Sequence, residues 1–159
     1  MKSLKKKLSI YKNKKILITG HTGFKGSWLS FWLNLLGAKI YGISNNIPTK
    51  PSFFKACGVD KISKNHYFDI KDSQKVKKTI FNIKPDFIFH LAAQSLVSKS
   101  YQNPNMTWES NLIGTKNIIE ALLNYKKKCS VVLITSDKCY KNIETHRPYS
   151  EKDILGGLD

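Results

Sequence analysis

Three glycines at three-residue spacing, Gly20, Gly23 and Gly26, lie between an apolar stretch and an apolar helical stretch. At a strand-to-helix turn, small residues let the backbone approach a pyrophosphate, and free N–H groups at the start of the helix face its negative charge. Glycine-rich turns also occur without a bound ligand, so the flanking elements decide between a ligand-binding turn and a turn with no function. Residues 14–19 and 39–44 have the character of buried parallel strands. This β-α-β context favours a bound dinucleotide over a turn with no function.

Strands and helices alternate along the rest of the chain. Strands are expected in residues 65–70, 87–93 and 130–135, and helices in residues 28–36, 51–57, 72–83 and from Pro104 to Leu122. Gly37 can end the first helix as a C-cap. Helices between buried parallel strands predict an α/β fold, a Rossmann-like doubly wound parallel sheet that is truncated after about five strands.

Composition limits the other possibilities. A chain of 159 residues with 41% hydrophobic residues can bury a single core. The net charge of +16 could indicate nucleic acid, but Arg147 is the only arginine and the lysines are scattered, so no specific nucleic-acid partner is expected. The Lys-rich residues 1–15 lack an apolar signal region, which predicts a cytoplasmic protein without a membrane partner. Three widely spaced cysteines favour neither a disulfide framework nor a metal site.

Polar and small residues fall at the carboxyl ends of the predicted strands, where a doubly wound sheet binds its ligand. These segments are Thr19-Gly20, Asp69-Ile70, Ala92-Ala93-Gln94 and Ser136-Asp137-Lys138. Each has a plain structural alternative. Asp69 can cap a turn or helix, Ala92 and Ala93 can serve tight packing, and His90 in an apolar strand is typical of a hydrogen-bonded core histidine.

The end of the second strand leaves the choice of dinucleotide open. NAD-binding Rossmann folds often place an Asp or Glu there, about 20 residues beyond the glycines, to hold the ribose hydroxyls. This chain has Ser44-Asn45-Asn46, with neither that acid nor an arginine for a 2′-phosphate. The local residues therefore fit NAD and NADP equally.

Several motifs together resemble the extended short-chain dehydrogenase/reductase family, in its nucleotide-sugar branch. They are Thr19-Gly-x-x-Gly-Phe24-x-Gly26, Asp69-Ile70, His90-Leu-Ala-Ala93 and Asn111-x-x-Gly114-Thr115. Three longer strings, beginning at Gly20, His90 and Thr135, look like those of the CDP-glucose 4,6-dehydratases. The similarity runs from about residue 14 to residue 159, which corresponds to the first half of such an enzyme. It implies a basic N-terminal extension over residues 1–13 and an incomplete NAD-binding domain over residues 14–159.

The resemblance implies a bound NAD that takes a hydride from C4 of CDP-glucose and returns it to C6 after water is lost across C5 and C6. By motif position, the residues expected along the pyrophosphate are Gly20, Gly23, Phe24, Lys25 and Gly26. Those expected near the adenine are Asp69 and Ile70, and those near the ribose and linker are Leu91, Ala92 and Ala93. Thr135 is expected on the nicotinamide side.

The resemblance also implies catalytic roles for three consecutive residues. Ser136 would hydrogen-bond the substrate hydroxyl, and Asp137 would protonate the leaving C6 hydroxyl. Lys138 stands where related dTDP-glucose and GDP-mannose dehydratases carry Glu, and a lysine acts as a base only if its pKa is lowered. An ion pair with Asp137 is the alternative, but the CDP-glucose branch has Lys here, which favours a catalytic or substrate-orienting role.

The family also uses a Tyr-x-x-x-Lys pair on the helix after the fifth strand, and this chain has no such pair there. Its two matches, Tyr11/Lys15 and Tyr67/Lys71, precede the first predicted strand and lie in the third. We therefore expect the isolated chain to be inactive and to bind NAD weakly at best. Three hypotheses follow: a dehydratase portion separated from its C-terminal half, a non-catalytic binding or interaction module that persists alone or pairs with a homologous subunit, or part of another nucleotide-sugar epimerase or dehydratase.

Overall fold

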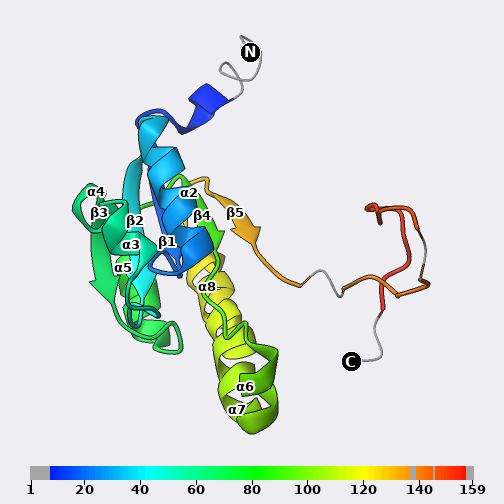
Figure 1. Ribbon diagram of the computed structural model, residues 1–159. Helices are drawn as coiled ribbons and strands as arrows, with labels where there is room; N and C mark the ends of the chain where they lie inside the picture. Colours follow the sequence, from blue (N-terminus) through cyan, green and yellow to red (C-terminus); the bar gives the residue numbers. More distant parts are fainter. Residues whose placement is uncertain (1–7, 137–138, 145, 157–159) are drawn as a thin grey trace.

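Five parallel strands form one sheet in the order β3-β2-β1-β4-β5 (Figure 1). The computed structural model describes residues 8–136, 139–144 and 146–156. The strands are β1 Lys15–Thr19, β2 Lys39–Ser44, β3 Ser63–Tyr67, β4 Phe87–His90 and β5 Ser130–Leu133. Chain order reverses direction between β1 and β4, as in a doubly wound sheet. The predicted Rossmann-like fold class is confirmed.

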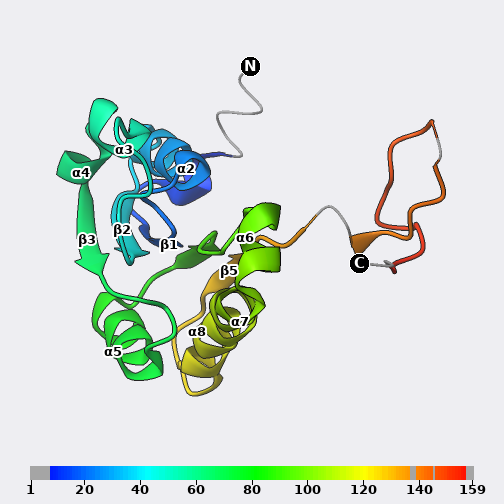
Figure 2. The ribbon, with the colours of Figure 1, turned by 60° about the horizontal axis from the view of Figure 1, so that its bottom comes forward.

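Helices cover both faces of the sheet (Figure 2). They are η1 Ser9–Tyr11, α2 Phe24–Leu35, α3 Phe53–Ala56, α4 Val59–Ile62, α5 Ser73–Ile83, α6 Val97–Gln102, α7 Pro104–Trp108, η2 Glu109–Ile113 and α8 Gly114–Leu123. Helices α2, α3 and α4 contact one another on one face, and α5 packs against α8 on the other. The predicted long helix from Pro104 is a continuous run of α7, η2 and α8, in which η2 is a turn of π-helix. No helix in the described part of the chain is both long and apolar enough to span a membrane.

Two hydrophobic clusters fill the space between the sheet and these helices. Within β1, Ile16 and Ile18 face α2, whereas Leu17 faces α5 and α8. This alternation follows from the two-residue period of a strand, and both faces are apolar because both are covered. The larger cluster joins strand residues to Val76, Ile80 and Ile83 of α5 and to Ile118 and Ala121 of α8. The helix pair α5 and α8 therefore contributes to the larger of the two clusters.

The predicted strands 65–70, 87–93 and 130–135 are wrong at their carboxyl ends. Pairing places Tyr67 beside Ser44, and His90 beside both Thr19 and Leu133, and each of these residues ends its strand. A strand extends only as far as the neighbouring strands offer backbone hydrogen-bond partners. The residue pattern of one segment does not show where its neighbours end. The β3 prediction also starts two residues late, and helices α4 and α6 were not predicted. As a result, Asp69, Ile70, Ala92 and Ala93 lie in loops beyond the strand ends.

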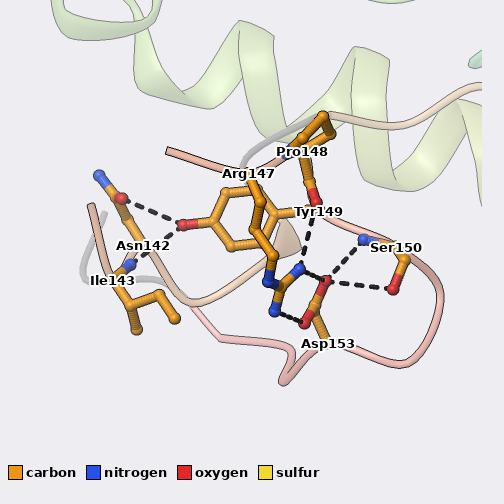
Figure 3. Close-up of polar contacts among 7 residues, drawn as sticks. All are labelled: Asn142, Ile143, Arg147, Pro148, Tyr149, Ser150 and Asp153. Carbon is orange, nitrogen blue, oxygen red and sulfur yellow. Dashed lines mark hydrogen bonds and ion pairs between the residues drawn. The ribbon is translucent and has the colours of Figure 1, made fainter. Parts of the chain in front are cut away.

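The segment that follows β5 is held by its own contacts (Figure 3). Arg147 donates two hydrogen bonds to Asp153, at 2.9 and 2.5 Å, and this guanidinium holds the pKa of Asp153 well below its usual range. The rings of Tyr140 and Tyr149 stack with centroids 5.3 Å apart, and the Tyr149 hydroxyl accepts from the Ile143 N–H. The chain's single arginine therefore shapes a loop.

Helix α2 ends as predicted, at a glycine with left-handed backbone. Gly37 has φ of +83° and its N–H donates to the Asn34 carbonyl. We expect Gly37→Ala to lower the free energy of unfolding by about 1 kcal/mol, because a Cβ disfavours this conformation. Gly37→Asn should lower it by less than half as much, since Asn tolerates positive φ. Urea denaturation measures both, and equal effects of Ala and Asn would contradict this explanation.

Candidate functional site

The carboxyl ends of β1 and β4 meet where the strand order reverses. Thr19 ends β1, His90 ends β4, and the two residues are register partners. Doubly wound sheets bind their ligands outside the strand ends at this switch point. The candidate site is therefore the region bounded by the glycine loop after β1 and the loop after β4.

Close backbone approach explains two of the three glycines. A Cβ on Gly20, which has φ of +72°, would lie 2.8 Å from the Ala92 nitrogen. A Cβ on Gly26 would overlap the Gly20 carbonyl oxygen. These contacts place the start of α2 directly against the glycine loop, and the glycine loop directly against the residues that follow β4. Gly20 and Gly26 are therefore required by packing, whatever binds there.

Gly23 is different, because its surroundings are less crowded. A Cβ there would meet only the Gly20 carbonyl oxygen, at 3.3 Å. Gly23 is the N-cap of α2, has extended backbone, and provides no side-chain cap. The first turn of α2 carries no acidic residue, so its N–H groups are not neutralised by a neighbouring carboxylate. The arrangement suits an anion.

A buried histidine fastens the glycine loop to β2 and β3. His21 is fully buried, its Nε2 lies 2.9 Å from Asn65 Oδ1, and its Nδ1 lies 3.0 Å from Ser44 Oγ. Its ring packs on the backbone of Gly42, where a Cβ would overlap it. Burial lowers the pKa of His21. The neighbouring Thr22 hydroxyl donates to the Asn46 carbonyl at 2.6 Å, which adds a second anchor.

A second buried histidine connects the elements on the other side of the site. His90 Nδ1 lies 2.6 Å from Thr19 Oγ1, and His90 Nε2 lies 2.9 Å from Thr115 Oγ1. Burial lowers the pKa of His90 to about 4. The Ala92 N–H donates to Thr19 Oγ1 at 3.2 Å. His90 is thus a hydrogen-bonded core histidine, as predicted, and it also connects β1, β4 and α8.

One helical run holds the loops after β3 and β4. Asn111 accepts from the Gln94 N–H at 2.7 Å and donates to the Gln94 carbonyl at 3.0 Å. Asn117 donates to the carbonyls of Ile70 and Lys71, both at 2.9 Å. The lack of a side chain on Gly114 makes room for Ile70. These positions fix two loops that bound the site.

The predicted cofactor residues lie around these loops in different environments. Phe24 and Lys25 are exposed at the start of α2, Leu91 and Ala92 are half-buried, and Ala93 is exposed. The structure brings Gly20, Gly23 and Gly26 together with Leu91 and Ala92.

The other predicted residues lie apart from this group or outside the described residues. Asp69 accepts from the Lys71 N–H at 2.9 Å, and the Ile70 side chain lies in the core. Thr135 and Ser136 are exposed beyond β5. Asp137 and Lys138 lie outside the described residues. The roles of all these residues stay predictions.

Sequence reasoning missed the anchoring roles of His21, Asn111, Thr115 and Asn117. Each is a polar residue in or beside a predicted element, and the sequence pattern does not identify its hydrogen-bond partner. Among the described residues, no cluster of His, Cys, Asp and Glu could hold a metal ion.

The chain is similar to known proteins over most of its length. Residues 17–157 match the family model described as GDP-mannose 4,6 dehydratase. The chain is 41% identical over 151 residues to CDP-glucose 4,6-dehydratase of Salmonella typhimurium, covering 95% of this chain and 42% of that protein. It is 33% identical over 141 residues to GDP-mannose 4,6-dehydratase of Vibrio cholerae serotype O1, covering 80% and 37%. The predicted similarity to the CDP-glucose 4,6-dehydratases is confirmed.

A solved structure shares the fold. UDP-glucose 4-epimerase of Thermus thermophilus, in complex with NAD, matches with a TM-score of 0.76 and 25% identity, covering 90% of this chain and 44% of that one. The chain thus spans less than half the length of these relatives. It belongs to the GDP-mannose 4,6-dehydratase family of nucleotide-sugar dehydratases and epimerases.

Proposed function

We propose that this chain binds NAD at the carboxyl ends of β1 and β4 and forms the cofactor-binding part of a CDP-glucose 4,6-dehydratase. The observation that carries the proposal is the open start of α2 at the switch point of the sheet. There Gly20 and Gly26 are required by packing, and Gly23 is left in less crowded surroundings. The 41% identity to the Salmonella enzyme supports CDP-glucose as substrate.

The residues fit a dinucleotide. The first-turn amides of α2 would hold the pyrophosphate, with the exposed Lys25 beside them. The main chain of Leu91 and Ala92 lies directly against Gly20, so residues 91–93 would border the ribose and linker. Asp69 would lie near the adenine. When bound, NAD would accept a hydride from C4 of the sugar and return it to C6 after water has left across C5 and C6.

NAD is preferred over NADP on the evidence of a relative. At the end of β2, the Ser44 hydroxyl contacts His21 and the Asn46 carbonyl accepts from Thr22. These groups anchor the glycine loop, and they give little basis for a choice between NAD and NADP. The Thermus thermophilus epimerase, which has the same fold, was solved with NAD.

The catalytic residues would come from the segment after β5. Because Leu133 pairs with His90, that segment leaves the sheet beside the proposed cofactor site. Thr135 would approach the nicotinamide, and Ser136 would hydrogen-bond the sugar hydroxyl at C4. Asp137 would protonate the C6 hydroxyl as it leaves, and Lys138 would orient the substrate or accept the C5 proton.

The proposed reaction also needs a Tyr-x-x-x-Lys pair, and the described members of the two matches in this chain have other contacts. Of the two Tyr-x-x-x-Lys matches, Tyr11 packs on Phe87 with ring centroids 5.1 Å apart, and Lys15 donates to the Ile83 carbonyl at the opposite end of the strands. Lys71 pairs with Glu109 at 2.8 Å. We propose that a C-terminal half or a homologous subunit completes the site, and that residues 14–159 are an incomplete NAD-binding domain preceded by a basic extension.

Two glycine variants distinguish an effect on NAD binding from an effect on the free energy of unfolding. We expect Gly23→Ala to raise the Kd for NAD at least tenfold, because its Cβ would stand where the pyrophosphate approaches, and to change the free energy of unfolding by less than about 1 kcal/mol. Gly26→Ala should lower that free energy by about 2 kcal/mol, because its Cβ overlaps the Gly20 carbonyl. Calorimetric titration and urea denaturation measure the two effects. Unchanged NAD affinity in Gly23→Ala would contradict the proposed pyrophosphate site.

The chain alone should not convert CDP-glucose in the presence of NAD. Product formation would be followed by chromatography of the nucleotide sugars, with the Salmonella typhimurium relative as a positive control. Turnover by the 159-residue protein would show that the missing Tyr-x-x-x-Lys pair is not needed.

A further inference from the structure

A chain of four hydrogen bonds crosses the candidate site, and its central bond, between Thr19 and His90, is buried. The Ala92 N–H donates to Thr19 Oγ1, which contacts His90 Nδ1, and His90 Nε2 contacts Thr115 Oγ1. The Thr115 hydroxyl in turn donates to the Asn111 carbonyl at 2.6 Å. Thr19 and His90 are both buried, with exposed fractions of 0% and 2%. The chain links β1, β4, the loop after β4, and the run of η2 and α8.

Counting protons fixes the direction of every bond. A hydroxyl has one proton, and that of Thr115 goes to Asn111, so Thr115 must accept from His90 and Nε2 must carry a proton. A neutral imidazole then has a lone pair on Nδ1, which accepts the proton of the Thr19 hydroxyl. The Thr19 oxygen remains free to accept from the Ala92 N–H. One tautomer satisfies every group.

We propose that His90 is a positioning residue for the cofactor site. Through Thr19, its neutral Nε2-protonated form holds the Ala92 main chain against Gly20. A Cβ on Gly20 would lie 2.8 Å from the Ala92 nitrogen, so a shift of Ala92 moves the loop that faces the proposed pyrophosphate. The link to NAD rests on the proposed function, whereas the link to Ala92 does not.

The surroundings keep His90 neutral. Strands β4 and β5 carry no other ionisable side chain. The charged groups on the other elements that contact His90 have partners elsewhere: Lys15 on the Ile83 carbonyl, Glu109 on Lys71, and Lys116 on Glu120. A proton on Nδ1 would turn it into a donor facing the Thr19 hydroxyl. The tautomer is therefore set by packing and by the two threonines.

Acid should weaken the fold through His90. Its pKa of about 4 in the folded chain is below the ordinary value of 6.5, so between these values the unfolded chain takes up a proton that the folded chain does not. Stability should therefore fall as the pH falls from about 6.5 to 4. We expect His90→Asn to lose less stability over this range than the wild type, even though His21 and His66, whose pKa values are also lowered, contribute to the slope of both. Urea denaturation at several pH values measures the difference.

Paired variants test the positioning role. Asn can place an oxygen near the position of Nδ1, and Gln can place its amide near Nε2, so His90→Asn should keep the Thr19 contact better than His90→Gln. Without cofactor, amide hydrogen exchange of Ala92 should be at least tenfold faster in Thr19→Val and His90→Gln, and less affected in His90→Asn. Ser100→Ala, which removes a hydroxyl that donates to the Val97 carbonyl on α6, is the control. Unchanged Ala92 exchange in Thr19→Val would overturn the proposal.

NAD titration of the same variants distinguishes the two proposals. Their Kd values should rise in the order of their Ala92 exchange rates, with at least a tenfold rise in Thr19→Val. If the wild type does not bind NAD, the proposed function fails, while the exchange data still decide whether His90 positions Ala92. Nitrogen NMR of wild-type His90 requires no variant to fold. It should show a protonated Nε2 and an unprotonated Nδ1 at neutral pH, and the opposite tautomer would overturn the proposal.

Discussion

The close contact of three backbone segments at Gly20 is the constraint on which the rest of the site depends. The exit of β1, the exit of β4 and the first turn of α2 meet there, at distances that leave no room for a Cβ on Gly20 or Gly26. This contact brings the N-terminus of α2 to the edge of the sheet at its switch point. Backbone N–H groups concentrated in this way form a site for a negatively charged group. The dinucleotide proposal follows from that geometry.

Buried polar residues maintain this contact from both sides. His21 ties the glycine loop to β2 and β3, and His90 ties β1 to β4 and α8. Burying an imidazole is unfavourable unless its nitrogens are hydrogen-bonded, and both rings meet that condition. Asn111 and Asn117 hold the neighbouring loops from a single helical run. The shape of the site is thus set by specific polar contacts in addition to the apolar core.

Local patterns in the sequence were sufficient for the order of the five strands, the sheet type, the C-cap at Gly37 and the position of the glycine loop. They were insufficient wherever a partner lies far along the chain. The end of β4 at His90 depends on where β1 and β5 end, and the partners of His90 lie 71 and 25 residues away. The core position of Ile70 depends on the space left by Gly114. The roles of Asp69, Thr135 and Ser136, and those of Asp137 and Lys138, remain predictions because they depend on a ligand.

The most direct test of the central claim is a titration of the isotopically labelled chain with NAD, followed by amide NMR. The account predicts saturable shifts at the amides of residues 20–26 and 91–93, with the largest at Phe24, Lys25 and Gly26. Amides of α5, which lies on the opposite face of the sheet, should not shift. No saturable shifts, or shifts confined to residues away from the start of α2, would contradict the account.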